Sequence, residues 1–157
     1  RKATLEIPIT RIAVEAEGHA YRFDILEQRK VRLPATIMRK IGLSQTVKAL
    51  HLRGLHQADG QPFLYEDRWV DLTTMPELVD VNFTVISPNE WLVRNQPFTR
   101  GDISFLAENA SAAQADALGT NEGAALFTIE RITWNVDRMV TFVRLSYRPG
   151  YQMTAVL

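Results

Sequence analysis

Two strand-like segments separated by a tight turn constrain the fold of this 157-residue chain most strongly. Residues 47–57 and 62–70 have the composition of strands, and the turn residues Ala58-Asp59-Gly60 stand between them, which predicts a β-hairpin. A second hairpin is predicted where residues 125–134 and 140–147 flank Asn135-Val136-Asp137-Arg138. Hairpins join antiparallel strands, whereas parallel strands need long crossover connections. We therefore expect an antiparallel sheet.

Short helices are predicted between these hairpins. Residues 9–16 follow Pro8 with helical spacing, and residues 34–41 end at Gly42. Ser87 and Ser111 each precede a Glu or Gln by three residues, so each predicts a capping box at a helix start. Further strands are expected at 21–25, 102–108 and 151–156, and the first residues read as the tail of a linker. No internal repeat is visible. The expected fold class is α+β, an antiparallel sheet with flanking helices, in a single domain over residues 1–157.

Composition excludes several classes of protein. The 18 basic and 18 acidic residues cancel, whereas a free-standing DNA-binding protein normally carries a basic excess. The chain has no cysteine, which removes disulfides and thiolate sites. It has no apolar run near the roughly 20 residues that span a bilayer, so no membrane partner is expected. We expect a cytoplasmic protein, and the start at Arg1 suggests a cut inside a longer one.

Metal and cofactor chemistry have little support in the sequence. The histidines are His19, His51 and His56, and the last two lie five positions apart on one strand, so they should face opposite sides of the sheet. Neither a glycine-rich phosphate loop nor a Gly-x-Ser-x-Gly elbow is present. We predict no metal ligands, no cofactor and no catalytic residues.

The register of the first hairpin decides which side chains share a face. A two-residue turn at Asp59-Gly60 would pair Arg53 with Glu66 as a cross-strand ion pair. A three-residue loop with a left-handed Gly60 would shift the pairing by one residue. In that register one face carries a cation, a carboxylate and an imidazole beside a glycine, which resembles the floor of a ligand site: Gly54, His56, Glu66 and Arg68.

Two other segments offer candidate ligand contacts. The helix that starts at Ser87 has free backbone N–H groups and a dipole that favour an anion such as a carboxylate, although a plain capped helix explains the same residues. Thr141 and Tyr147 lie on one face of the late strand, where Tyr147 places a hydroxyl at a pocket rim or packs at a sheet edge.

These residues resemble a known family. Arg53-x-x-His56, Asp59-Gly60-x-Pro62 and Glu66-Asp67-Arg68-Trp69-Val70 resemble the UTRA domain, the effector-binding domain of GntR-family transcriptional regulators. Phe83-Thr84-x-Ile86-Ser87-Pro88-Asn89-x-x-Leu92 and Thr133-Trp134 with Val140-Thr141 and Arg144-Leu145 are similar to its HutC branch, the histidine-utilisation repressors. The resemblance runs from about Ile9 to the C-terminus.

The resemblance implies a chorismate-lyase-like sheet, a homodimer, and a winged-helix DNA-binding domain that precedes this chain and alone contacts operator DNA. It implies ligand contacts at Gly54, His56, Glu66, Ser87, Thr141 and Tyr147, and it favours the three-residue loop. Relatives that sense sugar phosphates carry two arginines where this chain has Gly54 and His56, so a singly charged effector is expected here.

The HutC branch senses urocanate, and we expect a small carboxylate such as urocanate as the effector. Ser87 would hold its carboxylate, Glu66 would accept a donor from its ring, and His56 and Arg68 would set the polarity. Two other functions stay open on the sequence. One is a small lyase-like enzyme that acts on an aromatic carboxylate, and the other is a dimerising module with an empty pocket.

Overall fold

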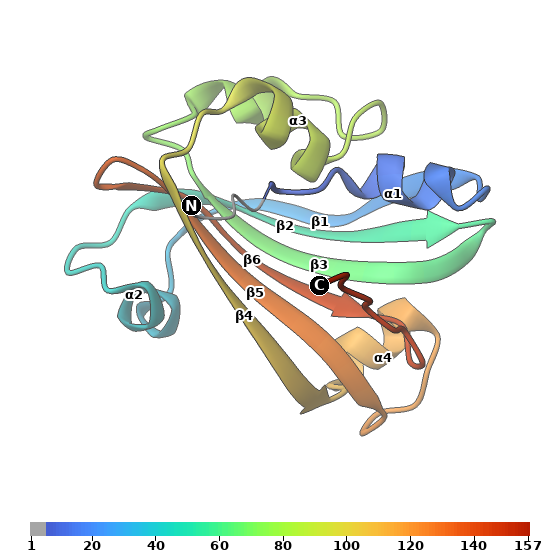
Figure 1. The fold of residues 1–157 in the computed structure, drawn as a ribbon. Coiled ribbons are helices and arrows are strands. Elements are labelled where there is room, and N and C mark those ends of the chain that lie inside the picture. Colours follow the sequence, from blue (N-terminus) through green and yellow to red (C-terminus); the bar gives the residue numbers. More distant parts are fainter. Residues whose placement is uncertain (1–5) are drawn as a thin grey trace.

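A computed structural model describes residues 6–157, so the expected linker tail at residues 1–5 lies outside the described part. Six antiparallel strands form one sheet in the order β1-β2-β3-β6-β5-β4, with helices on both sides (Figure 1). The elements are α1 (Thr10–Ala16), β1 (Tyr21–Arg32), α2 (Ala35–Ile41), β2 (Lys48–Ala58), β3 (Gln61–Asp71), the 3-10 helix η1 (Pro76–Asp80), α3 (Pro88–Asn95), β4 (Arg100–Asn109), α4 (Ala112–Leu118), β5 (Ala125–Asn135) and β6 (Arg138–Tyr147). The predicted α+β class is confirmed.

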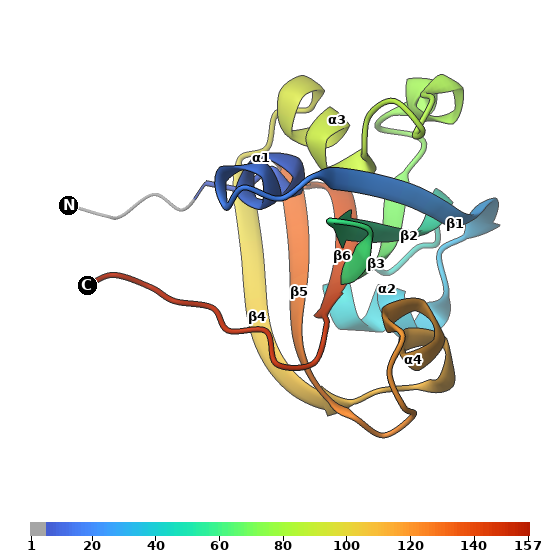
Figure 2. The same ribbon diagram turned by 90° about the vertical axis from the view of Figure 1, so that its right-hand side faces the viewer.

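The helices divide between the two faces of the sheet (Figures 1 and 2). On one face, here the α3 face, Leu50, Leu52 and Val70 pack with Leu78 of η1 and Leu92 of α3. On the other, the α4 face, the apolar side chains of the strands pack against α2 and α4 in two clusters. The strands β2, β3, β5 and β6 therefore contribute side chains to cores on both faces, because alternate side chains point to opposite faces.

The two halves of the chain repeat the same element order, which the sequence does not reveal. Each half runs helix, strand, helix, strand, strand. Strand β2 of the first half corresponds to β5 of the second, and they start at residues 48 and 125. Strand β3 corresponds to β6, and they start at residues 61 and 138. The strands of these two pairs thus start 77 residues apart, whereas β1 and β4 start at residues 21 and 100. Asp67 pairs with Arg144, also 77 residues on, at the middle of the sheet, so a pseudo-twofold axis passes between them.

The first hairpin places Gly54, His56, Glu66 and Arg68 on one face of the sheet, as expected, but a different backbone feature produces this register. Ala58 pairs with Gln61 across a two-residue turn in which Asp59 and Gly60 both have positive φ, 52° and 75°. The predicted three-residue loop is therefore wrong. The register changes instead at a β-bulge, because Gln57 pairs with Pro62 and His56 with Leu64, which leaves Phe63 unopposed. That extra residue brings Glu66 opposite Gly54.

The predicted helices are present, and their ends follow local sequence signals. Gly42 and Gly119 adopt the left-handed conformation that ends α2 and α4, and Ser111 and Gln114 form both bonds of a capping box. Ser87 caps α3 through its hydroxyl only, because the Glu90 side chain reaches away from the helix start. The strand expected at 151–156 is wrong, because that segment is irregular coil.

Candidate ligand-binding site

A continuous chain of hydrogen bonds crosses the α3 face beneath the helices. The Tyr21 hydroxyl lies 2.7 Å from His56 Nδ1, and His56 Nε2 lies 2.6 Å from Glu66 Oε1. Arg68 Nε donates to Glu66 Oε2 at 2.7 Å, and Arg68 Nη1 donates to Thr141 Oγ1 at 3.3 Å. His56, Glu66 and Arg68 are almost completely buried. Four of the seven predicted site residues, His56, Glu66, Arg68 and Thr141, are thus brought into direct contact.

Strand register explains why these side chains meet. Gly54 stands opposite Glu66, and Val70 stands opposite Thr141. Residues two apart on a strand share a face, so the side chains of His56, Glu66, Arg68 and Thr141 all project from the same one. His51 lies on the other face, where its ring stacks on Trp69, as the odd spacing from His56 predicts. Phe63, the unopposed residue of the bulge, is responsible for this arrangement, since an unbulged hairpin would pair Glu66 with Arg53 on the α4 face.

Glu66 is ionised in this environment. Burial alone would raise the pKa of its carboxyl, but the positive charge of Arg68 and the hydrogen bond from His56 outweigh burial and lower the pKa to about 2. An ionised carboxylate only accepts hydrogen bonds, so His56 Nε2 carries a proton and donates it. In the neutral ring Nδ1 then accepts from the Tyr21 hydroxyl, so both ring nitrogens are satisfied.

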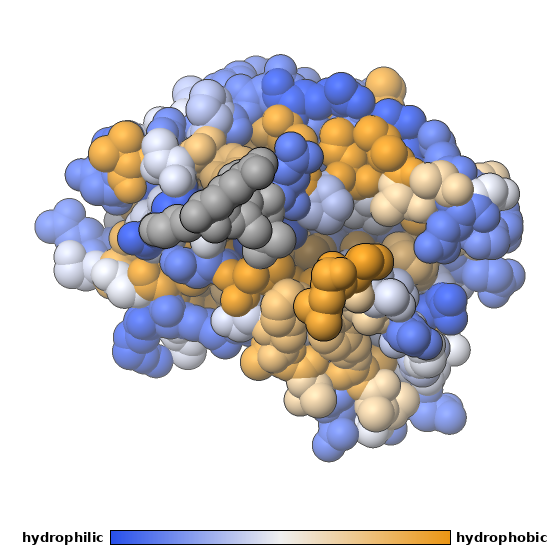
Figure 3. All heavy atoms as spheres, viewed as in Figure 1, coloured by the Kyte–Doolittle hydropathy of each residue, from blue (hydrophilic) through white to orange (hydrophobic). Residues whose placement is uncertain are grey.

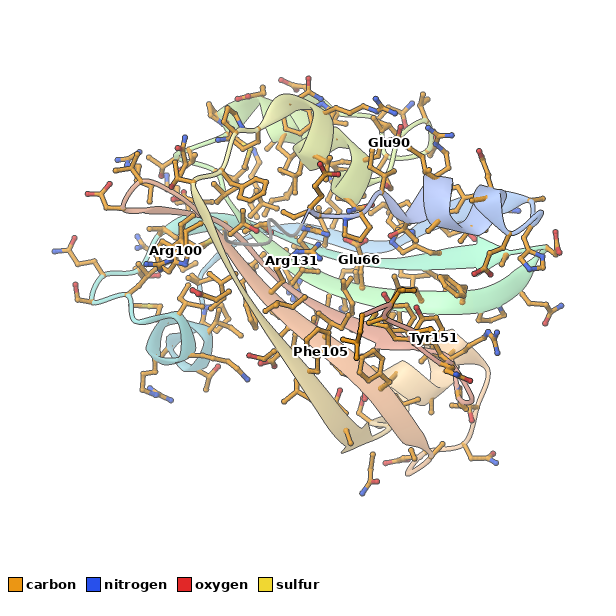
Figure 4. All side chains as sticks on the ribbon, in the orientation of Figure 1. Glu66, Glu90, Arg100, Phe105, Arg131 and Tyr151 are labelled. Carbon is orange, nitrogen blue, oxygen red and sulfur yellow. The ribbon has the colours of Figure 1, made fainter. Side chains whose placement is uncertain are left out.

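A second buried cation, Arg131 on β5, completes the site and was not singled out by the sequence. Val143 pairs with Arg68 on one side and with Arg131 on the other, so both guanidinium groups extend from the α3 face. Figure 4 shows Arg131 and Glu66 close together on this face. Burial, together with the charge of Arg68, lowers the pKa of Arg131 to about 10, which leaves it charged at neutral pH.

A small cavity of about 20 Å³ lies between these cations and α3. Its volume is enough for about one water molecule. The sheet side of the cavity is formed by Arg68, Arg131, Thr133, Val140 and Thr141. The opposite side is formed by Ile7, which precedes α1, and by residues of α3 and the segment after it: Asn89, Leu92, Val93, Gln96 and Phe98. Polar groups line the floor and mostly apolar groups form the lid.

The other three predicted residues occupy separate positions. The hydroxyl of Ser87 accepts the Glu90 N–H and lines an open groove of about 560 Å³ that also contains Tyr21. The ring of Phe23 fills the space over Gly54. Tyr147 lies on the α3 face at the end of β6, where its ring stacks on Tyr151 at 3.9 Å.

Hydrogen bonds join the start of α3 to the start of α1 and to the residues just before it. Asn89 accepts the Thr10 N–H at 2.8 Å and donates to the Pro8 carbonyl at 3.0 Å. Glu90 accepts two hydrogen bonds from Arg11, at 2.8 and 2.9 Å, and one from Arg94. The Arg11 hydrogen bond holds the pKa of Glu90 at about 2 despite its partial burial. These bonds join α3 to the first turn of α1 and to Pro8 before it.

Within residues 6–157, no group of three His, Asp or Glu side chains is placed to hold a metal ion. The helices of this part of the chain all lack the length and apolar character of a bilayer-crossing segment.

Comparisons with known proteins give the family. The profile of the UTRA domain matches residues 16–151. The histidine utilization repressor of Klebsiella aerogenes is 23% identical over 150 residues, which cover 96% of this chain and 62% of that protein. The repressor of the same name from Pseudomonas aeruginosa is 25% identical, with 96% and 60% covered. The chain thus spans about three fifths of these relatives.

Solved structures show the same fold. The C-terminal domain of the histidine utilization repressor from Pseudomonas syringae pv. tomato superposes with a TM-score of 0.79 at 21% identity, covering 88% of this chain and 99% of that one. The effector domain of PhnF from Mycobacterium smegmatis gives 0.82 at 20% identity, with 98% and 96% covered. Both curated relatives described above are named as repressors, and neither is named as an enzyme. The chain belongs to the UTRA domain family.

Proposed function

We propose that this domain senses a small carboxylate, with urocanate as the leading candidate, and so regulates a transcriptional repressor in the cytoplasm. Operator DNA would be bound by a winged-helix domain that precedes this chain. The observation that carries the proposal is the buried chain His56–Glu66–Arg68 beneath α3. A buried ionic network is costly to a fold, and a ligand-recognition role gives a reason for it.

The chemistry of the pocket suits an imidazole ring that bears a carboxylate. Glu66 is ionised and can accept a further N–H donor, and His56 adds a polarisable ring beside it. The excess of cations at Arg68 and Arg131 favours an anionic group. Ser87 and the first turn of α3 offer a second place for that group, while Thr141 and Tyr147 would close the far end of the pocket.

Effector binding requires α3 to move, because the cavity beneath it holds about one water molecule. Asn89 and Glu90 join α3 to Pro8, Thr10 and Arg11, so the movement would reach the segment that leads to the DNA-binding domain. Coupling of this kind typically amounts to about 1–3 kcal/mol, which is enough to change operator occupancy.

We also propose that the domain forms a homodimer. Apolar side chains gather on the open half of the sheet (Figure 3), where Ile103 and Phe105 on β4 are 40% and 58% exposed. β4 is an edge strand of the sheet, so a second copy can cover this face. Light scattering on the purified chain tests the dimer, and Phe105→Asp should shift the mass toward that of a monomer.

Calorimetry with urocanate tests the sensor function. Wild-type protein should release or absorb heat on titration and unfold at a higher temperature with millimolar urocanate. Glu66→Ala and His56→Ala should each weaken binding at least tenfold. A panel of histidine-pathway intermediates and small carboxylates that gives neither heat nor a thermal shift would refute the carboxylate sensor. Binding unchanged in both variants would favour the dimerising module instead.

A further inference from the structure

We infer that Arg131, Arg68 and Thr133 form an anion subsite that holds the carboxylate of the effector, directly beside the carboxylate of Glu66. The inference rests on the proposed sensor function and adds a specificity-determining residue, Arg131, to it. It also moves the expected position of the carboxylate from the α3 N-terminus to the sheet.

Unfilled hydrogen-bonding capacity is the first observation. Arg68 Nη2, Arg131 Nε and Thr133 Oγ1 are buried without a hydrogen-bond partner among residues 6–157. The three residues are 1%, 7% and 3% exposed, and all three line the same small cavity. Buried polar atoms without partners are rare in native proteins, and their convergence on one cavity indicates that a ligand completes them.

Charge balance is the second observation. Two guanidinium groups, those of Arg68 and Arg131, line the cavity from the sheet. The carboxylate of Glu66 lies outside this lining and neutralises Arg68 by an ion pair at 2.7 Å, which leaves one positive charge in excess. The nearest further carboxylates are engaged elsewhere. Glu90 on α3 is paired with Arg11 and Arg94, and Glu130 faces the opposite side of the sheet, where it binds Lys40 and Arg144.

The layout of the subsite selects the class of ligand. Arg68 and Arg131 flank Val143 from either side, so their Cα atoms lie two strand spacings apart, roughly 10 Å. One carboxylate fits between two guanidinium groups that converge from this separation, and Thr133 supplies a hydroxyl donor at one side. A single excess positive charge is neutralised by a monoanion, whereas a phosphate dianion would leave a buried negative charge.

The rival position at Ser87 is less suited to the carboxylate. Its hydroxyl already accepts the Glu90 N–H at 3.1 Å, and the residue lines the open groove rather than the cavity of the cations. The two positions make different predictions, because Arg131→Met and Ser87→Ala each remove only one of them.

Binding of urocanate and of its uncharged amide to the chain tests the subsite by calorimetry. Wild-type protein should bind the acid at least tenfold more tightly than the amide. Arg131→Met should abolish that preference, Thr133→Val should reduce it, and Arg100→Met, at an exposed arginine of β4, should retain it. If Arg131→Met keeps the preference, or if Ser87→Ala alone removes it, the inference is overturned.

Formate provides a readout that does not depend on the identity of the effector. At tens of millimolar it should raise the unfolding temperature of wild-type protein more than chloride at equal ionic strength, and this extra shift should vanish in Arg131→Met. A formate shift without urocanate binding would support the subsite while refuting urocanate as the effector. Urocanate binding without any role for Arg131 would leave the sensor intact and refute the subsite.

Discussion

Arg68 Nε donates to Glu66 Oε2 at 2.7 Å, although the two residues are separated by only one position on β3. Side chains two positions apart on a strand project from the same face, so the contact follows from the pleat of the strand. Both residues lie beneath α3 and are screened from water. The pair therefore fixes two charged groups on the sheet, next to which an effector could bind.

Replacing Glu66 by glutamine should strongly destabilise the fold. The variant leaves Arg68 buried opposite a neutral amide, and breaking a buried pair in this way costs about 3–5 kcal/mol. Urea unfolding at pH 7 measures the free energy of unfolding. Glu122→Gln, at an exposed position, is the matched control and should change it by less than about 0.5 kcal/mol. Equal stabilities of the two variants would show that the buried pair contributes nothing.

The stability that Glu66 provides should depend on acid pH. Its folded pKa of about 2 lies below the ordinary value of 4.5, so the folded protein stabilises the ionised form. This contribution is fully present above pH 4.5 and is lost as the pH falls toward 2. The difference in free energy of unfolding between wild type and Glu66→Gln should stay constant from pH 7 to about pH 5 and shrink below that. A difference that stays constant down to pH 3 would contradict the assigned ionisation.

A methyl group on Gly54 should destabilise the site by overpacking. A Cβ atom there would overlap the ring of Phe23, so Gly54→Ala should cost about 1–3 kcal/mol. Phe23→Leu shortens the opposing side chain, and the double variant should cost less than the sum of the two single changes. Urea unfolding of the four proteins completes the cycle, and strict additivity would show that the two positions do not interact.

The sequence predicts the elements of this fold well because their signals are local. Gly42 and Gly119 end helices by their backbone freedom, and Ser111 with Gln114 closes a capping box within four residues. The register of the first hairpin is less accessible. A bulge at Phe63 and a longer loop at Gly60 each shift the pairing of β2 with β3 by one residue, so both place Glu66 on the same face as His56. The spacing of the residues in the sequence does not distinguish them.

Long-range pairings account for what the sequence misses. Glu90 has the spacing of a capping-box residue, yet its carboxylate binds Arg11 from a distant helix, a contact that only tertiary packing creates. In the sequence, Arg131 is one charged residue within a strand, and nothing local distinguishes it from an exposed arginine. The repeat of 77 residues places it at the position that Gly54 holds in the first half, and this relation appears only once the strands are aligned.

Glu90→Gln should loosen the start of α1 without unfolding the domain. The change removes the ionic contacts of the largely buried Glu90 carboxylate with Arg11 and Arg94. The side chains of these two arginines are 34% and 50% exposed and can be solvated instead, so we expect a smaller global loss of stability than at Glu66. Amide hydrogen exchange should accelerate at least threefold in residues 9–16, while the unfolding temperature changes by only a few degrees. Glu15→Gln, which removes an exposed partner of the same Arg11, should leave exchange near the wild-type rate. Equal exchange in the two variants would exclude Glu90 as the link between the helices.

Replacing Arg131 by methionine should leave the ligand-free domain as stable as wild type or more stable. Arg131 is buried with an unpartnered Nε and faces the like charge of Arg68, so a side chain of similar length without charge relieves desolvation and repulsion. Arg144→Met is the contrast, because Arg144 donates to Glu130 and Glu108 at 2.8 and 2.6 Å, and its loss should cost about 2–3 kcal/mol. Thermal unfolding without ligand ranks the three proteins. A loss of stability in Arg131→Met as large as that in Arg144→Met would mean that Arg131 is structural, whereas the expected order indicates a cation kept for a ligand.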